Sequence, residues 1–296
     1  MAVLGLIDIA GRGIGREHAL ELARQGAKVV VNDLGATNHG EGKDEGPAAE
    51  VVSTIKAMGG EAFANGADVA NWAQTKLLVD ETVATFGRLD VVVNNAGFVR
   101  DRMFVSCSEE EWDAVVNVHL KGHFCLSRHA AAYWRDQVKA GQKVDARIIN
   151  TSSGAGLQGS VGQATYSAAK AGIAALTLVA AAEMSRIGVT VNAIAPSART
   201  RMTETVFADM MATQGQDFDA MAPENVSPLV VWLGSVQSRD VTGQVFEVEG
   251  GKIRVAEGWA HGPEIDKGAK WDPAELGPVV ADLLKQERTP VPVYGS

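Results

Sequence analysis

The sequence contains little cysteine: Cys107 and Cys125 are the only two in 296 residues. Two distant thiols cannot provide the disulfide framework of a small secreted domain, and their spacing is not that of a zinc site. We therefore expect both to be free thiols in a reducing compartment, the cytoplasm.

Basic residues are also scarce. The 27 Lys and Arg are outnumbered by 36 Asp and Glu, which gives a formal net charge of −9. Nucleic acids and anionic membranes attract basic surfaces, so we expect neither as a partner. Long apolar runs are missing too: the N-terminal MAVLGLIDIA is shorter than a membrane span, and no basic region precedes it as in a signal peptide. It predicts a buried strand.

A glycine-rich turn follows this strand, which we place at Val3 to Ile9. The turn comprises Gly11, Arg12, Gly13, Ile14 and Gly15, and a helical pattern follows it. Glycines between a strand and a helix let the backbone approach a pyrophosphate, whose charge the helix N-terminus stabilises. Asp33 ends the next predicted strand, where a carboxylate binds the adenosine ribose diol and repels a 2′-phosphate. These features favour NAD over NADP.

The segment Ile148 to Lys170 carries the strongest chemical signal. It begins as an apolar strand, passes through a Gly/Ser-rich turn with Ser153, and enters an alanine-rich helix with Tyr166 and Lys170. Residues four apart share one helix face, so the Lys170 ammonium lies beside the Tyr166 phenol. A neighbouring cation is expected to lower the pKa of the phenol, which makes it a usable proton donor or acceptor.

Ser153 followed by the YSAAK segment resembles the short-chain dehydrogenase/reductase family. The end of the second strand, VVNDLG, and the long loop after it look most like the (3R)-hydroxyacyl-CoA dehydrogenase branch and its multifunctional β-oxidation relatives. The resemblance implies a single α/β Rossmann-type domain with a doubly wound, mainly parallel seven-stranded sheet. It covers residues 1–253; residues 254–296 are an extension expected to pack on the same domain or a neighbouring subunit.

The resemblance also implies roles for individual residues. Tyr166 is expected to exchange a proton with the substrate oxygen, Ser153 to polarise the substrate, and Lys170 to hold the nicotinamide ribose. Asn117 matches the active-site asparagine, at a local helix distortion. The residues expected to line the NAD site are Gly11, Arg12, Gly13, Ile14, Gly15, Asp33, Asp68, Val69, Asn95, Ala96, Gly97, Tyr166, Lys170, Pro196 and Thr200.

The leading hypothesis is an NAD-dependent oxidoreductase that interconverts a secondary alcohol and a ketone. A 3-hydroxyacyl-CoA or a hydroxysteroid-like substrate is expected, and 3-oxoacyl-carrier reduction is a close alternative. A different hypothesis follows from Asp8 and Ile9, which replace the Thr and first Gly of the family turn. Because Ile resists positive φ and Asp repels phosphate, the chain could instead be a cofactor-impaired binding or assembly subunit.

Two further features concern partners. His119 and His123 lie four residues apart, and His129 follows, but no acidic residue completes a metal pattern, so we expect packing or a subunit surface and no metal. The predicted helix Ala164 to Ser185 is apolar around most of its circumference, which indicates burial on more than one side. We expect a homodimer or homotetramer.

Overall fold

The computed structural model describes residues 4–8, 11–36, 42, 44, 46–200, 218–286 and 291–295. The strands of its eight-stranded sheet lie in the order β3-β2-β1-β4-β5-β6-β7-β8. All pairs are parallel except β7 with β8. The strands are β1 (Leu4–Asp8), β2 (Lys28–Asn32), β3 (Ala62–Asn65), β4 (Val91–Asn94), β5 (Ala146–Thr151), β6 (Val189–Ser197), β7 (Val245–Glu249) and β8 (Lys252–Val255).

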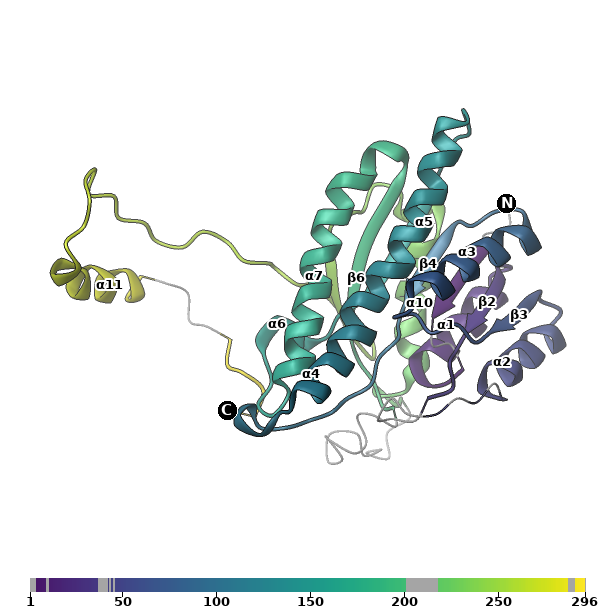
Figure 1. Ribbon diagram of the computed structural model, residues 1–296, viewed down its shortest axis with the longest axis horizontal. Coiled ribbons are helices and arrows are strands. Elements are labelled where there is room, and N and C mark those ends of the chain that lie inside the picture. Colours follow the sequence, from purple (N-terminus) through teal and green to yellow (C-terminus); the bar gives the residue numbers. More distant parts are fainter. Residues whose placement is uncertain are drawn as a thin grey trace.

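Helices cover both faces of the sheet (Figure 1). One hydrophobic cluster joins α1, α2 and α10 to one face, and a second joins α3, α5 and α7 to the other. The helices are α1 (Gly13–Arg24), α2 (Gly46–Ala57), α3 (Trp72–Phe86), α4 (Glu109–Val116), α5 (Gly122–Lys139), α6 (Gly154–Gln158), α7 (Ala164–Met184), α10 (Ser227–Gly234) and α11 (Leu276–Leu284). The predicted doubly wound α/β fold is confirmed.

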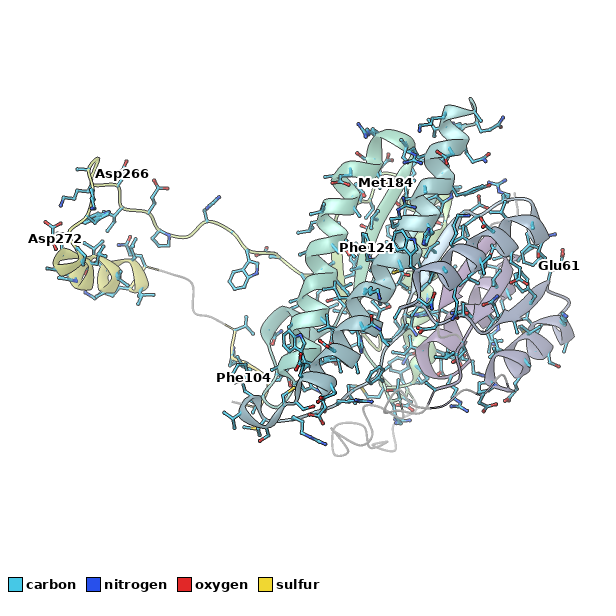
Figure 2. The ribbon with its side chains drawn as sticks, in the orientation of Figure 1. Glu61, Phe104, Phe124, Met184, Asp266 and Asp272 are labelled. Atoms are coloured by element: carbon cyan, nitrogen blue, oxygen red, sulfur yellow. The ribbon has the colours of Figure 1, made fainter. Side chains whose placement is uncertain are left out.

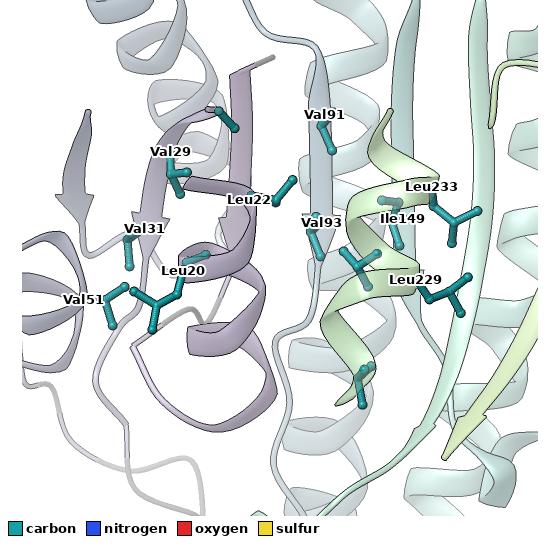
Figure 3. Packing of buried hydrophobic residues seen from close by; sticks show 14 of the residues in the cluster. Leu20, Leu22, Val29, Val31, Val51, Val91, Val93, Ile149, Leu229 and Leu233 are labelled. Carbon is teal, nitrogen blue, oxygen red and sulfur yellow. The ribbon is translucent and has the colours of Figure 1, made fainter. Parts of the chain in front are cut away.

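Valine runs explain why the central strands are buried on both faces. In β4, Val91 and Val93 belong to the α1/α2/α10 cluster, whereas Val92 belongs to the other. Alternate side chains of a strand point to opposite faces, so a continuous apolar run suits a strand covered on both. Figure 3 shows Val91 and Val93 beside Leu229 and Leu233 of α10.

The end of the sheet differs from the prediction. The sequence QVFEVEGGKI reads as a single closing strand, but the chain turns back at Gly250 and Gly251 and forms β7 and β8. Gly250 has φ +54°, a conformation that side-chain-bearing residues rarely adopt, and this ends the first strand. The extra strand is exposed, and the predicted boundary at residue 253 falls inside it.

The chain after β8 forms a C-terminal arm, residues 256–286, that extends away from the sheet (Figure 1). It carries the predicted extra helix as α11, and its Asp266 and Asp272 lie far from the body in Figure 2. The chain returns at Val291–Gly295, where the Val161 amide donates to the Tyr294 carbonyl at 2.9 Å. Residues Val291–Gly295 of the predicted extension therefore pack on the same chain.

Helix α7 is buried along one stripe in this single chain. The stripe contains Thr165, Ala169, Lys170, Ile173, Thr177 and Ala181. On the opposite face Leu178 and Val179 are exposed, so the predicted burial on a second side is not provided by the chain itself. Among the described residues, the stretch Ala164–Ile187 is the one helix whose length and composition would allow it to cross a membrane. One stripe of this helix packs on the sheet, and much of the rest of its surface is not covered by the described residues.

Candidate active site

The predicted site residues follow the carboxyl ends of neighbouring parallel strands. Asp33 follows β2, Asn95 follows β4, Ser153 follows β5 and Thr200 follows β6. The order of strands reverses between β1 and β4, and open α/β sheets bind ligands in the crevice at such a point. The topology thus brings together residues that are far apart in the sequence.

The glycine turn after β1 fits the pyrophosphate of a dinucleotide. Helix α1 begins at Gly13 with φ +53°, its N-cap Arg12 makes no side-chain cap in the described structure, and no acidic residue lies in its first turn. The first backbone N–H groups of a helix have no partner within it and attract anions. Ile14 and Gly15 belong to this first turn. Ile9, the basis of the cofactor-impaired hypothesis, lies outside the described residues, and the side chain of Asp8 is not described either.

Asp33 is held directly against this turn. Its Oδ2 accepts from the Gly11 amide at 3.0 Å, and its Oδ1 accepts from the Gly35 amide at 2.7 Å. A methyl group on Gly11 would lie 2.4 Å from Asp33 Oδ2, so the turn needs glycine here. The carboxylate is therefore buried and fixed at the end of β2, beside the glycine turn.

The remaining cofactor candidates line the same edge. Asp68 Oδ1 accepts from the Ala70 amide at 2.9 Å, and the adjacent Val69 is buried. Ala96 is buried, whereas Asn95, Gly97 and Pro196 are partly buried. A methyl group added to Gly13 would lie 3.6 Å from Cγ2 of Thr200, which places Thr200 beside the glycine turn.

Ser153, Tyr166 and Lys170 converge at the end of β5. Ser153 caps helix α6, where its Oγ accepts from the Ala155 amide at 3.2 Å, and it also hydrogen-bonds the Tyr166 hydroxyl. The Lys170 Nζ lies 5.6 Å from the centroid of the Tyr166 ring and donates to the Thr151 carbonyl at 2.7 Å. A hydroxyl, a phenol and an ammonium are thus placed together, the set needed to exchange a proton with a substrate oxygen.

Burial, not the ammonium, dominates the charge states of this pair. Burial raises the pKa of Tyr166. The hydrogen bond with Ser153 lowers this pKa, and the charge of the Asp101 carboxylate raises it. Burial also lowers the pKa of Lys170 to about 7. The predicted lowering of the Tyr166 pKa by Lys170 is therefore wrong for this structure, because removal from water disfavours both charged forms.

The assignment of Asn117 also requires correction. The predicted helix distortion exists: Asn117–Lys121 is a π-helical turn between α4 and α5. However, the Asn117 side chain is exposed, and its Oδ1 accepts from Lys121 Nζ at 3.1 Å. The residue of this turn that reaches the active site is the buried His119, whose ring centroid lies 5.3 Å from that of Tyr166.

All three histidines of this region are buried. His119 and His123 are fully buried, and His129 Nε2 lies 3.0 Å from the Trp72 carbonyl. No group of three or more His, Cys, Asp and Glu side chains in the described part of the chain could hold a metal. Cys107 and Cys125 are free, as expected.

Sequence reasoning missed Asp101 and Gln163. Gln163 Nε2 donates to Asp101 Oδ2 at 3.0 Å, and burial raises the pKa of Asp101. Both line a cavity of about 370 Å³, together with Met103, Val161 and Tyr294. Gln163 is the N-cap of α7, only three residues before Tyr166, and this adjacency was the only sequence signal.

The depressed pKa of Lys170 predicts a dependence of stability on pH. Between pH 7 and the ordinary Lys value of 10.5 the unfolded chain binds more protons at this residue than the folded chain, so stability rises with pH. Relative to Lys170→Met, the wild-type free energy of unfolding should increase from pH 7 to pH 9.5 by about a few kcal/mol. Urea unfolding of both proteins at several pH values measures this difference, and parallel curves would contradict the assignment.

Comparisons with known proteins show the family of the chain. Residues 6–211 match the short chain dehydrogenase family. The chain is 45% identical over 291 residues to hydroxyacyl-CoA dehydrogenase ChsB1 of Mycobacterium tuberculosis, covering 95% of this chain and 88% of the relative. It is 44% identical over 248 residues to peroxisomal multifunctional enzyme type 2 of Mus musculus, covering 84% of this chain but 32% of that longer protein.

A solved structure gives the same result. The crystal structure of a short chain dehydrogenase from Mycobacterium avium superposes with a TM-score of 0.90 at 67% sequence identity, covering 99% of this chain and 98% of the other. The family match, these relatives and the Ser153, Tyr166 and Lys170 arrangement lead to one assignment. The chain belongs to the short-chain dehydrogenase/reductase family and is an oxidoreductase that acts on CH–OH groups.

Proposed function

We propose that the protein is an NAD-dependent dehydrogenase of 3-hydroxyacyl-CoA substrates. The observation that carries the proposal is the placement of Ser153, Tyr166 and Lys170 at the same sheet edge as the Asp33 carboxylate and the glycine turn. The names of ChsB1 and of the peroxisomal multifunctional enzyme support the acyl-CoA class. The earlier cofactor-impaired alternative is not supported by these relatives.

The residues divide the reaction between them. When bound, the nicotinamide ring supplies or accepts the hydride. In reduction, Tyr166 donates its proton to the carbonyl oxygen as negative charge develops there, and Ser153 donates a hydrogen bond to the same oxygen. Lys170, held by the Thr151 carbonyl, supplies positive charge to the Tyr166 phenolate formed in this step. In oxidation the proton moves the opposite way.

A substrate panel tests the acyl-CoA class. We expect NAD-linked turnover of (3R)-hydroxybutyryl-CoA and weaker turnover of its (3S) enantiomer, of the corresponding acyl-carrier-protein thioester and of a hydroxysteroid. The measurement is kcat/KM from absorbance at 340 nm. A preference for the carrier-protein thioester or the steroid by about tenfold or more, which is about 1.4 kcal/mol, would replace the proposed substrate.

Cofactor preference depends on Asp33. The wild type should bind NADH more tightly than NADPH because the buried carboxylate meets the 2′-phosphate with like charge. Asp33→Ser keeps an acceptor for one backbone amide and removes the charge, so the ratio of the two dissociation constants should shift toward NADPH by about tenfold. Asp44→Asn is the matched control, since Asp44 lies on the same side of the site at 3.4 Å from Arg12. Tighter NADPH binding by the wild type would exclude this role.

We also propose a homo-oligomer assembled through the outer face of α7. Leu178 and Val179 are 51% and 56% exposed on a helix that otherwise packs against the sheet. Light scattering should give a dimer or tetramer at micromolar concentration, and Leu178→Arg should shift it toward monomer. A monomeric wild type would contradict the proposal. The cytoplasmic location stays a prediction.

A further inference from the structure

The π-helical turn Asn117–Lys121 presents His119, not Asn117, to the active site. Residues two apart on a helix point to nearly opposite sides, since each residue turns the chain by about 100°. Asn117 therefore faces outward when His119 is fully buried. Single π-helical turns occur frequently at functional sites, where they redirect side chains.

The His119 ring is clamped from three directions. It lies on Gly97 so closely that a methyl group there would be 2.2 Å from its Cε1. Its Nε2 lies 2.7 Å from the Phe98 carbonyl oxygen, and its ring meets the Tyr166 ring edge to face at an interplanar angle of 87°. The ring thus joins the chain after β4 to the phenol on α7, and Gly97 makes room for it.

The charge of His119 follows from its burial and from the nearby Lys170. Burial and the charge of Lys170 lower its pKa to about 3, so the imidazole is neutral at working pH. Nε2 contacts both backbone groups of Phe98: it lies 2.7 Å from the carbonyl oxygen, and the Phe98 amide nitrogen lies 3.0 Å from it. Nδ1 is buried and has no hydrogen-bond partner within the described residues. A neutral ring adds no competing charge beside Tyr166.

Other titratable groups surround this ring. His123, one helical turn later, accepts at Nε2 from the Thr151 amide at 3.3 Å, and the Thr151 carbonyl holds Lys170. Burial lowers the pKa of His123 as well, followed by the charge of Lys170. The charge of the Asp101 carboxylate, which lines the cavity described above, raises the pKa of Tyr166. Both histidines that the charge of Lys170 affects are therefore neutral: His119 contacts the Tyr166 ring, and His123 accepts from the Thr151 residue whose carbonyl holds Lys170.

We propose that His119 is a positioning residue for Tyr166. Its ring, oriented by Gly97 and the Phe98 carbonyl, fixes the phenol edge-on so that the hydroxyl points toward Ser153 and the substrate oxygen. This inference rests on the oxidoreductase reaction proposed above, and it assigns to the ring of His119 a role in kcat. The role belongs to the ring shape, and the contacts of Nε2 with the Phe98 backbone hold the ring in place.

Two substitutions distinguish the contribution of the His119 ring from that of its hydrogen bonding. His119→Phe keeps an aromatic ring against Tyr166 but loses the hydrogen bonding of Nε2 with the Phe98 backbone, whereas His119→Gln keeps a side chain that can hydrogen-bond and loses the ring. A misplacement of a reacting group by about 1 Å costs about 10²-fold, so H119Q should lower kcat by about that factor, whereas H119F should stay within about fivefold. The KM for substrate and the Kd for NADH should change by less than about threefold in both variants.

A role limited to stability gives a different result. In that case kcat would follow the melting temperature of the variants, and H119F, with an unpaired buried carbonyl, would be no better than H119Q. His129→Gln is the matched control. It is also a buried histidine, with Nε2 at 3.0 Å from a backbone carbonyl and an edge-to-face contact to an aromatic ring, that of Trp72, but it lies away from Tyr166. H129Q should keep the wild-type kcat.

An NMR measurement that needs no substrate tests the positioning role of His119 independently of the acyl-CoA assignment. The chain has three tyrosines, so ¹³C-labelled tyrosine gives few ring signals, and Tyr166→Phe identifies the Tyr166 signal. H119Q should remove the shift that the imidazole ring imposes on Tyr166, and H119F should retain a distinct shifted signal. If the wild type fails to turn over any acyl-CoA, the proposed function is wrong. If the Tyr166 signal is unchanged in H119Q, or H119Q keeps the wild-type kcat, the positioning role is wrong.

Discussion

Tyr166→Phe is expected to reduce kcat by about 10²–10⁴-fold, the usual contribution of a positioned general acid. The substitution removes only the phenolic hydroxyl. The ring that packs against His119 and beneath Lys170 remains, so the fold and the cofactor site should be retained. The measurement is kcat for acetoacetyl-CoA reduction, with NADH affinity followed by fluorescence on the same preparations.

Two controls make this result specific. Tyr133→Phe changes a tyrosine on α5 outside the Ser153, Tyr166 and Lys170 group and should keep the wild-type rate. NADH affinity of Y166F should remain within about threefold of the wild type if only proton transfer is lost. Residual activity of Y166F within about threefold of the wild type would remove Tyr166 from the mechanism.

Gly156→Ala is expected to damage both stability and activity. An added methyl group would lie 2.6 Å from the backbone carbon and the Cβ of Lys170 and 2.8 Å from the Ala171 amide nitrogen. Helices α6 and α7 can approach this closely only because Gly156 has no side chain. The backbone of α7 cannot yield as a flexible side chain does, so overpacking should cost about 1–3 kcal/mol and shift Lys170 and Tyr166 relative to Ser153.

Thermal unfolding and kcat measure the two consequences together. For a chain of this size each kcal/mol lowers Tm by about 2–4 °C, and a displaced Tyr166 should lower kcat by about 10²-fold. Gly251→Ala is the matched control, because an added methyl group there meets no atom within 4 Å. An unchanged Tm and kcat for Gly156→Ala would show that the close approach of α6 to α7 is not needed.

Much of the fold could be predicted because its signals are local. Apolar runs such as Val91–Val93 indicate strands covered on both faces. The doubly wound topology was implied by the resemblance to the family. The division of the last strand at Gly250 was missed. Two consecutive glycines are compatible with either a weakened strand or a turn, and only the pairing of β8 with β7 distinguishes them.

The site was predictable where spacing alone determines proximity. Tyr166 and Lys170 share a helix face, and Asp33 follows its strand directly, so the structure places them as the sequence implied. Asn117 and His119 differ by two positions on a helix, and which of them faces inward depends on the π-helical turn and on Gly97 of another strand. The pKa of Tyr166 depends on burial, which is a tertiary property.

We propose that this site transfers hydride between NADH and the C3 carbon of a 3-oxoacyl-CoA while Tyr166 supplies the proton. The most direct measurement uses acetoacetyl-CoA with NADH carrying deuterium at both C4 positions, followed by mass spectrometry of the product. The account predicts 3-hydroxybutyryl-CoA with one deuterium at C3 from the wild type and almost none from Tyr166→Phe. Tight NADH binding without deuterated product, or equal product from both proteins, would contradict it.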